Sequence, residues 1–398
     1  MKKILIIGAG FLQQFVIQKA KKLGYYVLAL DGNPNAIGFR YADLFAVIDI
    51  TDKEKCLRFA MNNQIDGVIT AATDYGVLTV SYIAQKMGLP GLDFDVATIV
   101  RNKYKVRNCL HNNHVDDFDQ TFEVDTDTNI MSLSKKLSYP VFVKPCDGSG
   151  SRAACKVNSE HELPLAITAA INSSTTHHAE IETFIDGKEY GAESFVYNGK
   201  IHVFAIMQKW MTNPPYYAEL GHAIPNDLPF EIEKKAVECI KNAIRALGIN
   251  YGSVNMDIII SKSGKVFIVD IGARMGGNLI GSNIIPLGTG IDYMSIIIKS
   301  AVKDSVSFKP FTQKKAVATR LLAFKNGTVM NMPDMDSIEK KYNCKIYHHI
   351  KTGERVYEYH TNLDGLGYIV ATATSKIDAE RNASSALKEM EEIIFGVE

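Results

Sequence analysis

The sequence lacks several features that would assign it to a specialised class of protein. Its six cysteines include no C-x-x-C pair and no framework of short spacings, so we expect reduced thiols. No run of about 18 apolar residues occurs, which argues against a membrane-spanning helix. Lysine plus arginine equals aspartate plus glutamate, at 44 each, so no net charge favours nucleic acid or an anionic membrane. We therefore expect a cytoplasmic protein.

Two common catalytic patterns are also missing. The Walker phosphate loop, G-x-x-x-x-G-K-[ST], does not occur, and no Ser-His-Asp set is evident. The 398 residues suggest roughly two or three domains. An apolar fraction of 46% is ordinary for a globular protein with a substantial core.

The amino terminus resembles two unrelated signals. Residues 5–13, LIIGAGFLQ, read as a strand and a glycine turn, and Gly8 and Gly10 fit a dinucleotide-binding fingerprint. However, Gln13 stands where the third glycine belongs. The opening lysines and apolar run also resemble a secretion signal, but no small-residue cleavage site follows, so we do not expect one. A nicotinamide-dependent oxidoreductase stays open as an alternative that Gln13 argues against.

Strand and helix patterns alternate through residues 3–90, which predicts an α/β fold with a parallel sheet. Several strands follow in succession after residue 103. Residues 231–248 have apolar residues on one side and end at a glycine, as an amphipathic helix does. The tail from about residue 303 mixes short strands with one final helix, residues 378–395.

The most informative stretch is NMDIIISKSGKVFIVDIGARMGGN, residues 255–278. Two strand patterns flank KSGK, so we expect a two-residue turn at Ser263 and Gly264. This register places Asp257 directly opposite Asp270, with Cβ atoms about 4.5–5.5 Å apart. Facing carboxylates repel, and a hard cation such as Mg²⁺, which takes oxygen ligands, would explain them.

An ordinary structural explanation remains open for the same pair. A three-residue turn would shift the register, and one aspartate would then cap a turn or face solvent. Arg274 favours the functional interpretation, because a cation beside carboxylates, followed by Gly276 and Gly277, suits an anionic ligand.

Two further stretches are each weak evidence by themselves. VFVKPCDGSGSR places Lys144 near a strand end, before a glycine and serine loop that could present backbone N–H groups to phosphate. Such loops are more often plain hairpin connections. IETFIDGKEYGAES carries Glu182 and Glu189, which are either exposed acids or acceptors for adenine and ribose. His111 and His114 form an H-x-x-H that nothing nearby completes, so we expect surface residues.

Taken in order, these stretches resemble the ATP-grasp superfamily, specifically its carboxylate–amine ligases. The resemblance rests on NK at 102–103, VKPCDGSGSR at 143–152, IETFIDGKEYGAES at 181–194 and VNMD…VFIVDIGAR at 254–274. It implies an α/β chain with a Rossmann-like parallel N-terminal domain, a two-part ATP-grasp α+β domain and a C-terminal β-rich subdomain. The implied segments are a pre-ATP-grasp domain at 1–101, a small lid at 102–181, a catalytic core at 182–302 and a C-terminal subdomain at 303–398.

The resemblance also implies roles for individual residues. Asp257 and Asp270 would hold Mg²⁺ or Mn²⁺, Arg274 would orient the reacting carboxylate or acyl phosphate, and Glu219 and His222 would position or deprotonate the amine. The ATP-binding residues would be Lys103, Lys144, Gly148, Ser149, Gly150, Ser151, Glu182, Phe184, Ile185 and Glu189. The sequence departs from many relatives at Gly272, where a further metal ligand, Asn, is usual.

The implied activity is ATP-dependent amide formation between small-molecule carboxylate and amine substrates. An acyl phosphate would be the intermediate, and ADP and phosphate would be released. A purine-pathway ligase that acts on a phosphoribosyl amine or on bicarbonate is the main alternative, and a nucleotide-binding protein without catalysis is another. Relatives are commonly dimers, so we expect a homodimer. The resemblance gives no reason to expect nucleic acid or membrane partners.

Overall fold

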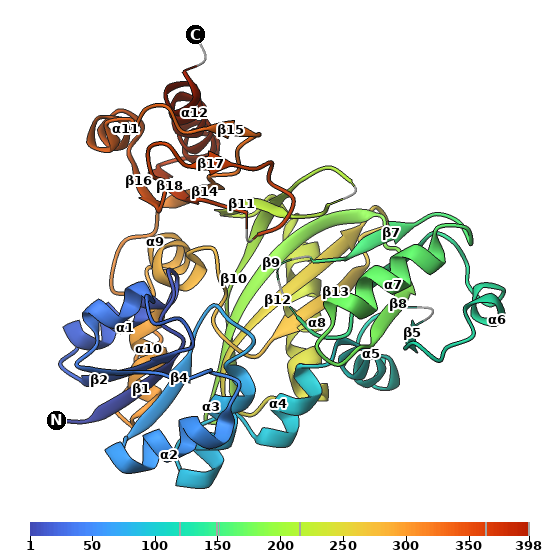
Figure 1. The fold of residues 1–398 in the computed structure, drawn as a ribbon, viewed down its shortest axis with the longest axis horizontal. Helices are drawn as coiled ribbons and strands as arrows, with labels where there is room; N and C mark the ends of the chain where they lie inside the picture. Colours follow the sequence, from blue (N-terminus) through green and yellow to red (C-terminus); the bar gives the residue numbers. More distant parts are fainter. Residues whose placement is uncertain (119–120, 149, 151, 215, 363, 397–398) are drawn as a thin grey trace.

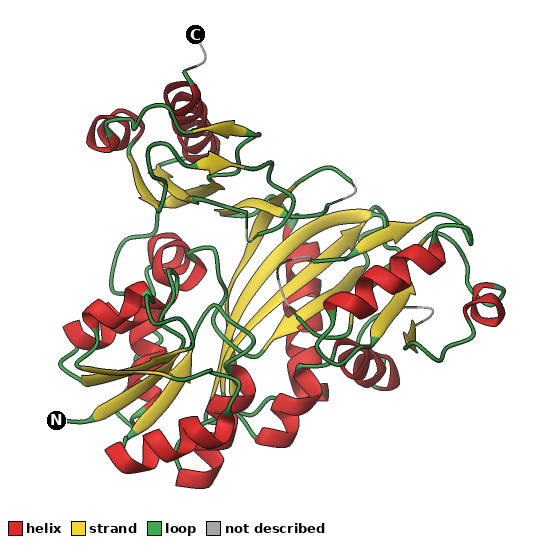
Figure 2. Cartoon of the chain, in the orientation of Figure 1, coloured by secondary structure: helices red, strands yellow, loops and turns green. Residues whose placement is uncertain are grey.

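The computed structural model describes all residues except 119–120, 149, 151, 215, 363 and 397–398. The described residues form three sheets of four or more strands and one two-stranded sheet in the C-terminal region (Figures 1 and 2). A small N-terminal sheet lies at one side, a long curved sheet occupies the centre, and a lid sheet lies at the other side of the central sheet. No helix in the described part of the chain combines the length and the apolar character needed to cross a membrane.

The N-terminal sheet has four strands, and all of its pairings are parallel, as predicted. Its order is β3-β2-β1-β4, with β1 (Lys3–Ile7), β2 (Tyr26–Asp31), β3 (Leu44–Val47) and β4 (Gly67–Thr70). The connecting helices are α1 (Gln13–Lys22), η1 (Ile37–Tyr41), α2 (Lys53–Asn63) and α3 (Val77–Met87).

Both faces of this sheet are covered, which explains why its strands are apolar without interruption. Ile4 and Ile6 pack with α1 and with α10 (Tyr293–Ala301) on one face. Leu5 and Ile7 pack with α2 and α3 on the other face. Helix α10 comes from far along the chain, so the N-terminal sheet shares a core with a segment that follows the central strands (Figure 1).

Gln13 closes the glycine turn that follows β1. Its Nε2 donates a hydrogen bond of 2.7 Å to the Ala71 carbonyl, and its side chain is 8% exposed. A Cβ placed on Gly8 or Gly10 would lie within 3.3 Å or 2.9 Å of the Gln13 side chain. The glutamine therefore fills the space where a dinucleotide pyrophosphate would approach the turn. This packing argues against the oxidoreductase alternative.

The lid sheet is antiparallel and has the order β5-β8-β6-β7. Its elements, with the two helices that precede it, are α4 (Phe94–Val100), α5 (Lys103–Asn112), β5 (Thr121–Val124), α6 (Ile130–Ser134), β6 (Val141–Pro145), β7 (Cys155–Val157), α7 (Leu163–Ser173) and β8 (Ala179–Thr183). The side chains of α7 pack on one face of the sheet, where Ile167 meets Val141 and Val143.

The central sheet has eight strands in the order β13-β12-β9-β10-β11-β14-β18-β16. Its first part comprises β9 (Gly187–Tyr197), β10 (Lys200–Met211), β11 (Glu219–Ile224), α8 (Phe230–Ala246), β12 (Gly252–Ser261), β13 (Val266–Gly272), η2 (Ile280–Ile284) and α9 (Ile285–Thr289). Helix α8 packs Ala236, Ile240 and Ile244 onto this sheet, as its periodicity predicts.

The C-terminal region extends the same sheet. Its elements are β14 (Ala316–Leu321), β15 (Gly327–Thr328), α11 (Met335–Tyr342), β16 (Cys344–His348), β17 (Arg355–Val356), β18 (Gly367–Ala373) and α12 (Lys376–Phe395). Strand β14 pairs with β11, so the sheet runs without a break from the β12–β13 hairpin to β14, β18 and β16, whereas β15 and β17 pair only with each other.

Candidate active site

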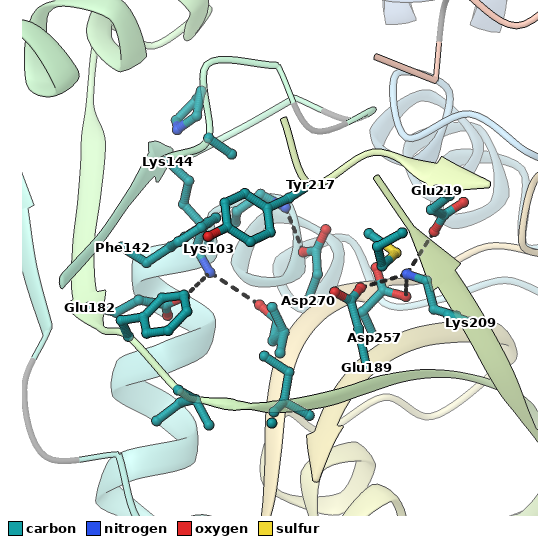
Figure 3. Close-up of a pocket in the computed structure, with 18 of the residues that line it drawn as sticks. Lys103, Phe142, Lys144, Glu182, Glu189, Lys209, Tyr217, Glu219, Asp257 and Asp270 are labelled. Atoms are coloured by element: carbon teal, nitrogen blue, oxygen red, sulfur yellow. Dashed lines mark hydrogen bonds and ion pairs between the residues drawn. The ribbon is translucent and has the colours of Figure 1, made fainter. Parts of the chain in front are cut away.

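A cavity of about 390 Å³ lies between the lid sheet and the central sheet (Figure 3). It brings together most of the residues that the sequence predicts as ligands. These are Lys103, Lys144, Gly148, Gly150, Glu182, Phe184, Ile185, Glu189, Glu219, Asp257 and Asp270. His222 and Arg274 do not line it. Ser149 and Ser151, also predicted to contact phosphate, lie outside the described residues.

The hairpin β12–β13 places Asp257 opposite Asp270, as predicted, but it does so by a different route. The predicted two-residue turn is wrong: Ile260 pairs with Val266, and the Ser261 N–H bonds to the Lys265 carbonyl. The loop therefore has three residues, 262–264, which end at Gly264 with φ of +78°. This longer loop shifts the register by one residue.

A bulge at Val269 shifts the register back. Ile258 pairs with Ile268, while Asp257 pairs with Asp270, so Val269 is the extra residue. The bulge also turns the Val269 carbonyl toward Lys144, whose Nζ donates to it at 3.1 Å. The bulge thus restores the pairing of the two aspartates and supplies a carbonyl that accepts a hydrogen bond from Lys144.

Each of the two aspartates is bonded to a different lysine (Figure 3). Lys103 Nζ lies 2.5 Å from Asp270 Oδ1, and Lys209 Nζ lies 2.8 Å from Asp257 Oδ1. Burial raises the pKa of Asp257 to about 7, although Lys209 opposes this shift. Burial would also raise the pKa of Asp270, but the charge of Lys103 and its hydrogen bond outweigh burial and lower that pKa to about 2.

Lys209 was not predicted, and it is the most heavily engaged cation of the cavity. Its Nζ lies 2.6 Å from Glu189, 2.7 Å from Glu219 and 2.8 Å from Asp257, and its side chain is 1% exposed. Burial lowers the pKa of Lys209, but the three carboxylates outweigh burial and raise it well above the ordinary value. One lysine therefore ties the hairpin to β9 and β11.

The opposite end of the cavity is apolar on two sides. Phe142 and Phe184 from the lid have ring centroids 6.4 Å apart, and Tyr217 approaches Phe142 edge-on at 5.6 Å. Ile185 and Ile259 also line this end. A flat apolar slot next to a charged region suits a ligand with an aromatic base at one end and anions at the other.

Glu182 and Lys144 form a buried pair beside this slot. Lys144 Nζ lies 2.7 Å from Glu182 Oε1 and 3.5 Å from Glu180 Oε2. The Arg107 Nε lies 3.7 Å from the second oxygen of Glu182. The Glu182 carboxylate is thus engaged by two cations of the protein itself.

Arg274 lies behind the charged end of the cavity. Its NH2 lies 2.9 Å from Asp74 Oδ2, in the N-terminal domain, and its NH1 lies 3.1 Å from Asn255 Oδ1. Below it, the buried Glu193 accepts hydrogen bonds from Asn255, from the Gly276 N–H and from the Tyr293 hydroxyl. The arginine is therefore held from two sides.

The structure separates the predicted pair Glu219 and His222. Glu219 lines the cavity and also accepts a hydrogen bond from Asn278. His222 is 1% exposed, and burial lowers its pKa to about 4. Its backbone N–H donates to Thr319 Oγ1 at 2.9 Å. The imidazole is thus a neutral, enclosed group beneath the cavity wall.

The glycine loop lies at the mouth of the cavity. Gly148 and Gly150 have φ of +102° and +79°, conformations that favour glycine. Arg152 NH2 donates to the Tyr75 hydroxyl at 2.5 Å, so the loop contacts the N-terminal domain.

Among the residues that the structure describes, no group of three or more His, Cys, Asp or Glu side chains could hold a metal. Two facing carboxylates at a cavity wall still suit Mg²⁺, which keeps several waters and substrate phosphates as ligands.

Comparison with known proteins identifies the central region. The family of ATP-grasp domains matches residues 137–282. An uncharacterised protein of Sinorhizobium fredii (strain NBRC 101917 / NGR234), y4rH, is 22% identical over 388 residues, 94% of this chain and 79% of that protein.

Two curated enzymes match shorter segments. The D-alanine–D-alanine ligase of Flavobacterium johnsoniae is 31% identical over 125 residues, 30% of this chain and 38% of the enzyme. The formate-dependent phosphoribosylglycinamide formyltransferase of Prochlorococcus marinus subsp. pastoris is 27% identical over 176 residues, 44% of either chain. This chain thus spans less than half of each of these two enzymes.

Solved structures share the fold over nearly the whole chain. The L-amino acid ligase of Bacillus licheniformis has a TM-score of 0.84 and 22% identity over 98% of both chains. The phosphoribosylglycinamide synthetase of Anaerococcus prevotii has a TM-score of 0.77 and 23% identity over 98% of both chains. The biotin carboxylase domain dimer of Hydrogenobacter thermophilus 2-oxoglutarate carboxylase, solved with MgADP, has a TM-score of 0.78 and 15% identity, and covers 97% of this chain and 89% of its own.

The family match confirms the predicted ATP-grasp domain over residues 137–282, and the solved structures confirm the predicted fold class. The match to an ATP-grasp domain agrees with the predicted use of ATP.

Proposed function

We propose that this chain, which contains an ATP-grasp domain, is an ATP-dependent carboxylate–amine ligase that forms an amide bond and releases ADP and phosphate. The observation that carries the proposal is the pair Asp257 and Asp270, which face each other at the wall of a cavity that also holds Lys103, Lys144 and Lys209. Facing acids beside several lysines are the groups that bind a metal-bound polyphosphate.

ATP would extend from one end of the cavity to the other. The adenine would occupy the apolar slot formed by Phe142, Phe184 and Ile185, and Glu189 at the wall would accept hydrogen bonds from the ribose. The phosphates would extend toward Lys103 and Lys144, below the glycine loop. Asp257 and Asp270 would hold Mg²⁺, which supplies charge neutralisation to the phosphates.

The reaction proceeds in two displacements. An oxygen of the substrate carboxylate attacks the γ-phosphorus, and the bond from this phosphorus to the bridging oxygen of ATP breaks. This step forms an acyl phosphate, and ADP is the leaving group. The amine then attacks the acyl carbon, loses a proton and displaces phosphate. The protein supplies positioning and charge stabilisation for both steps and needs no covalent nucleophile.

Residues at and behind the charged end of the cavity would act on the carboxylate and amine substrates. Arg274, held by Asp74 and Asn255, would orient the carboxylate and stabilise the acyl phosphate. Glu219, at the cavity wall, would position the amine and receive its proton. His222, which is buried and neutral behind the cavity wall, would help to position Glu219.

One observation favours the purine-pathway alternative. Arg152 bonds to the Tyr75 hydroxyl, and the Arg101 guanidinium lies 5.8 Å from the centre of the Tyr75 ring. Two guanidinium groups around Tyr75, of which Arg152 lines the cavity, would suit the phosphate of a phosphoribosyl amine. The homodimer and the cytoplasmic location predicted from the sequence stay predictions.

A screen for ADP formation with MgATP distinguishes these candidates. Pairs of amino acids are supplied together and singly, and the product mass is recorded alongside phosphate release. Dependence of ADP formation on two substrates together supports the ligase. ADP formation with bicarbonate or a phosphoribosyl amine, and with no amino acid pair, replaces the proposal by the alternative.

A further inference from the structure

The loop that follows β4, residues 71–76, reaches from the N-terminal domain into the ATP-grasp domain. Ala71 forms a parallel bridge with Met275, and the Ala72 N–H donates to the Met275 carbonyl at 3.0 Å. Ala72 itself has φ of +56°, which is unfavourable for a residue with a Cβ. Contacts with the segment after β13 thus hold this loop in a strained form.

Asp74 of this loop bonds to the arginine behind the carboxylate pair. The Asp74 and Arg274 side chains are 10% and 14% exposed, and NH2 to Oδ2 measures 2.9 Å. A charged pair so poorly exposed is little screened by water, so the position of the guanidinium depends on the aspartate. Asn255 holds NH1 from the opposite side.

Tyr75, the next residue, bonds to an arginine of a different element. Its hydroxyl accepts a hydrogen bond of 2.5 Å from Arg152, in the glycine loop of the lid. Tyr75 therefore supplies a bond between the N-terminal region and a residue that lines the cavity.

We propose that Asp74 and Tyr75 are positioning residues: Asp74 orients Arg274 toward the transferred phosphoryl group, and Tyr75 holds Arg152 at the wall of the nucleotide cavity. Two adjacent residues of the N-terminal domain would thus fix the positions of two arginine side chains of the ATP-grasp domain. This inference rests on the proposed function, because it assigns Arg274 to the reacting groups.

The two residues predict different defects in binding. Asp74→Asn keeps the shape and one acceptor oxygen but removes the charge that orients Arg274. We expect MgAMP-PNP to bind this variant within about twofold of the unmodified protein. The complex of MgADP with aluminium fluoride, a mimic of the phosphoryl group in transfer, should bind roughly tenfold more weakly, because a hydrogen bond between charged groups is disturbed.

Tyr75→Phe removes only the hydroxyl. We expect MgAMP-PNP to bind this variant about fivefold to tenfold more weakly, because one hydrogen bond to a charged group is lost. Trypsin cleavage at Arg152, which bound MgAMP-PNP should suppress in the unmodified protein, should continue in the variant. A defect confined to folding would not separate the two ligands in this way.

Two variants of the same domain serve as matched controls. Asp43→Asn removes an aspartate that pairs with Lys21, and Tyr25→Phe removes a hydroxyl that bonds to Asp304 at 2.5 Å. Both controls should bind the two nucleotide complexes as the unmodified protein does. Asp74→Glu should recover part of the affinity for the complex of MgADP with aluminium fluoride, since it restores the negative charge.

The outcomes separate this inference from the proposed function. If no amino acid pair supports ADP formation but the two variants show their distinct binding defects, the ligase assignment fails and the positioning stands. If the unmodified protein is a ligase and both variants bind like their controls, the positioning is overturned and the ligase stands. Equal defects of both variants toward both ligands also overturn it.

Discussion

Asp257 lies directly opposite Asp270 across the β12–β13 hairpin, and the two carboxylates are bonded to different lysines, Lys209 and Lys103. The pair therefore stands at the junction of two cation networks. One network leads to β9, β10 and β11, and the other leads to helix α5. A divalent cation that enters between the aspartates would compete with both lysines and release them toward phosphate oxygens.

Asp270→Asn should lower the rate of ADP formation roughly 100-fold or more, because the amide is a poor ligand for Mg²⁺ and contributes no charge. The fold should survive, because the Asp270 side chain lines the cavity and an amide in its place keeps one acceptor oxygen. Rates of ADP formation and thermal unfolding measure the two effects. Asp117→Asn is the control, because Asp117 pairs with Lys265 at the surface. Near-normal activity of the Asp270 variant would count against the metal assignment.

Lys209→Met should reduce the free energy of unfolding by about 3 kcal/mol, because three carboxylates lose their shared, buried partner. Added Mg²⁺ should raise the melting temperature of this variant more than that of the unmodified protein, because the uncompensated acids attract the cation. Urea unfolding with and without MgCl₂ tests this. Lys262→Met, at a lysine whose side chain is 83% exposed, should change stability by less than about 1 kcal/mol. A Lys209 variant as stable as that control would refute the account of the cluster.

His222 should make the protein sensitive to acid. Its pKa of about 4 in the folded protein lies below the ordinary value of 6.5, so the unfolded chain binds a proton that the folded chain does not. The contribution is complete above pH 6.5 and is lost as the pH falls toward 4, by about 3 kcal/mol. His222→Gln should flatten this part of the stability profile, whereas His111→Gln, at an exposed site, should leave it unchanged. Parallel profiles for both variants would show that His222 is not buried as described.

Glu193 should make the folded protein less stable as the pH rises, which is the opposite of the effect of His222. Burial raises the pKa of Glu193 to about 7, so between pH 4.5 and 7 the folded chain holds a proton that the unfolded chain has lost. Stability from this group is present below pH 4.5 and declines as the pH rises through 7, by about 3 kcal/mol. The difference in unfolding free energy between the protein and Glu193→Gln should therefore change across this range. A constant difference would mean that Glu193 is ionised throughout.

The sequence was sufficient to predict the parallel N-terminal sheet and helix α8, because these follow from local periodicity. The pairing of the two aspartates was predicted from a two-residue turn that is wrong. The pairing holds because a bulge at Val269 compensates for the longer loop, and no local pattern marks such a bulge. Helix α11, Met335–Tyr342, was also missed within a tail that was expected to hold one helix.

Contacts between distant segments explain what remained hidden. Lys209 lies in a mostly apolar part of β10, and only the fold shows that three acids from other strands meet it. Asp74 and Arg274 are 200 residues apart, so their pairing depends on how the N-terminal domain docks. Gln13 did carry a local signal, since it replaces the third glycine of the fingerprint, and the structure shows the physical effect of that replacement.

The route of a carboxylate oxygen tests the central claim most directly. Once a substrate pair is found, the carboxylate is labelled with ¹⁸O, and the inorganic phosphate released in the reaction is analysed by mass spectrometry. Transfer through an acyl phosphate predicts that each phosphate carries one ¹⁸O from the substrate. Unlabelled phosphate, released together with the joined product, would contradict the mechanism.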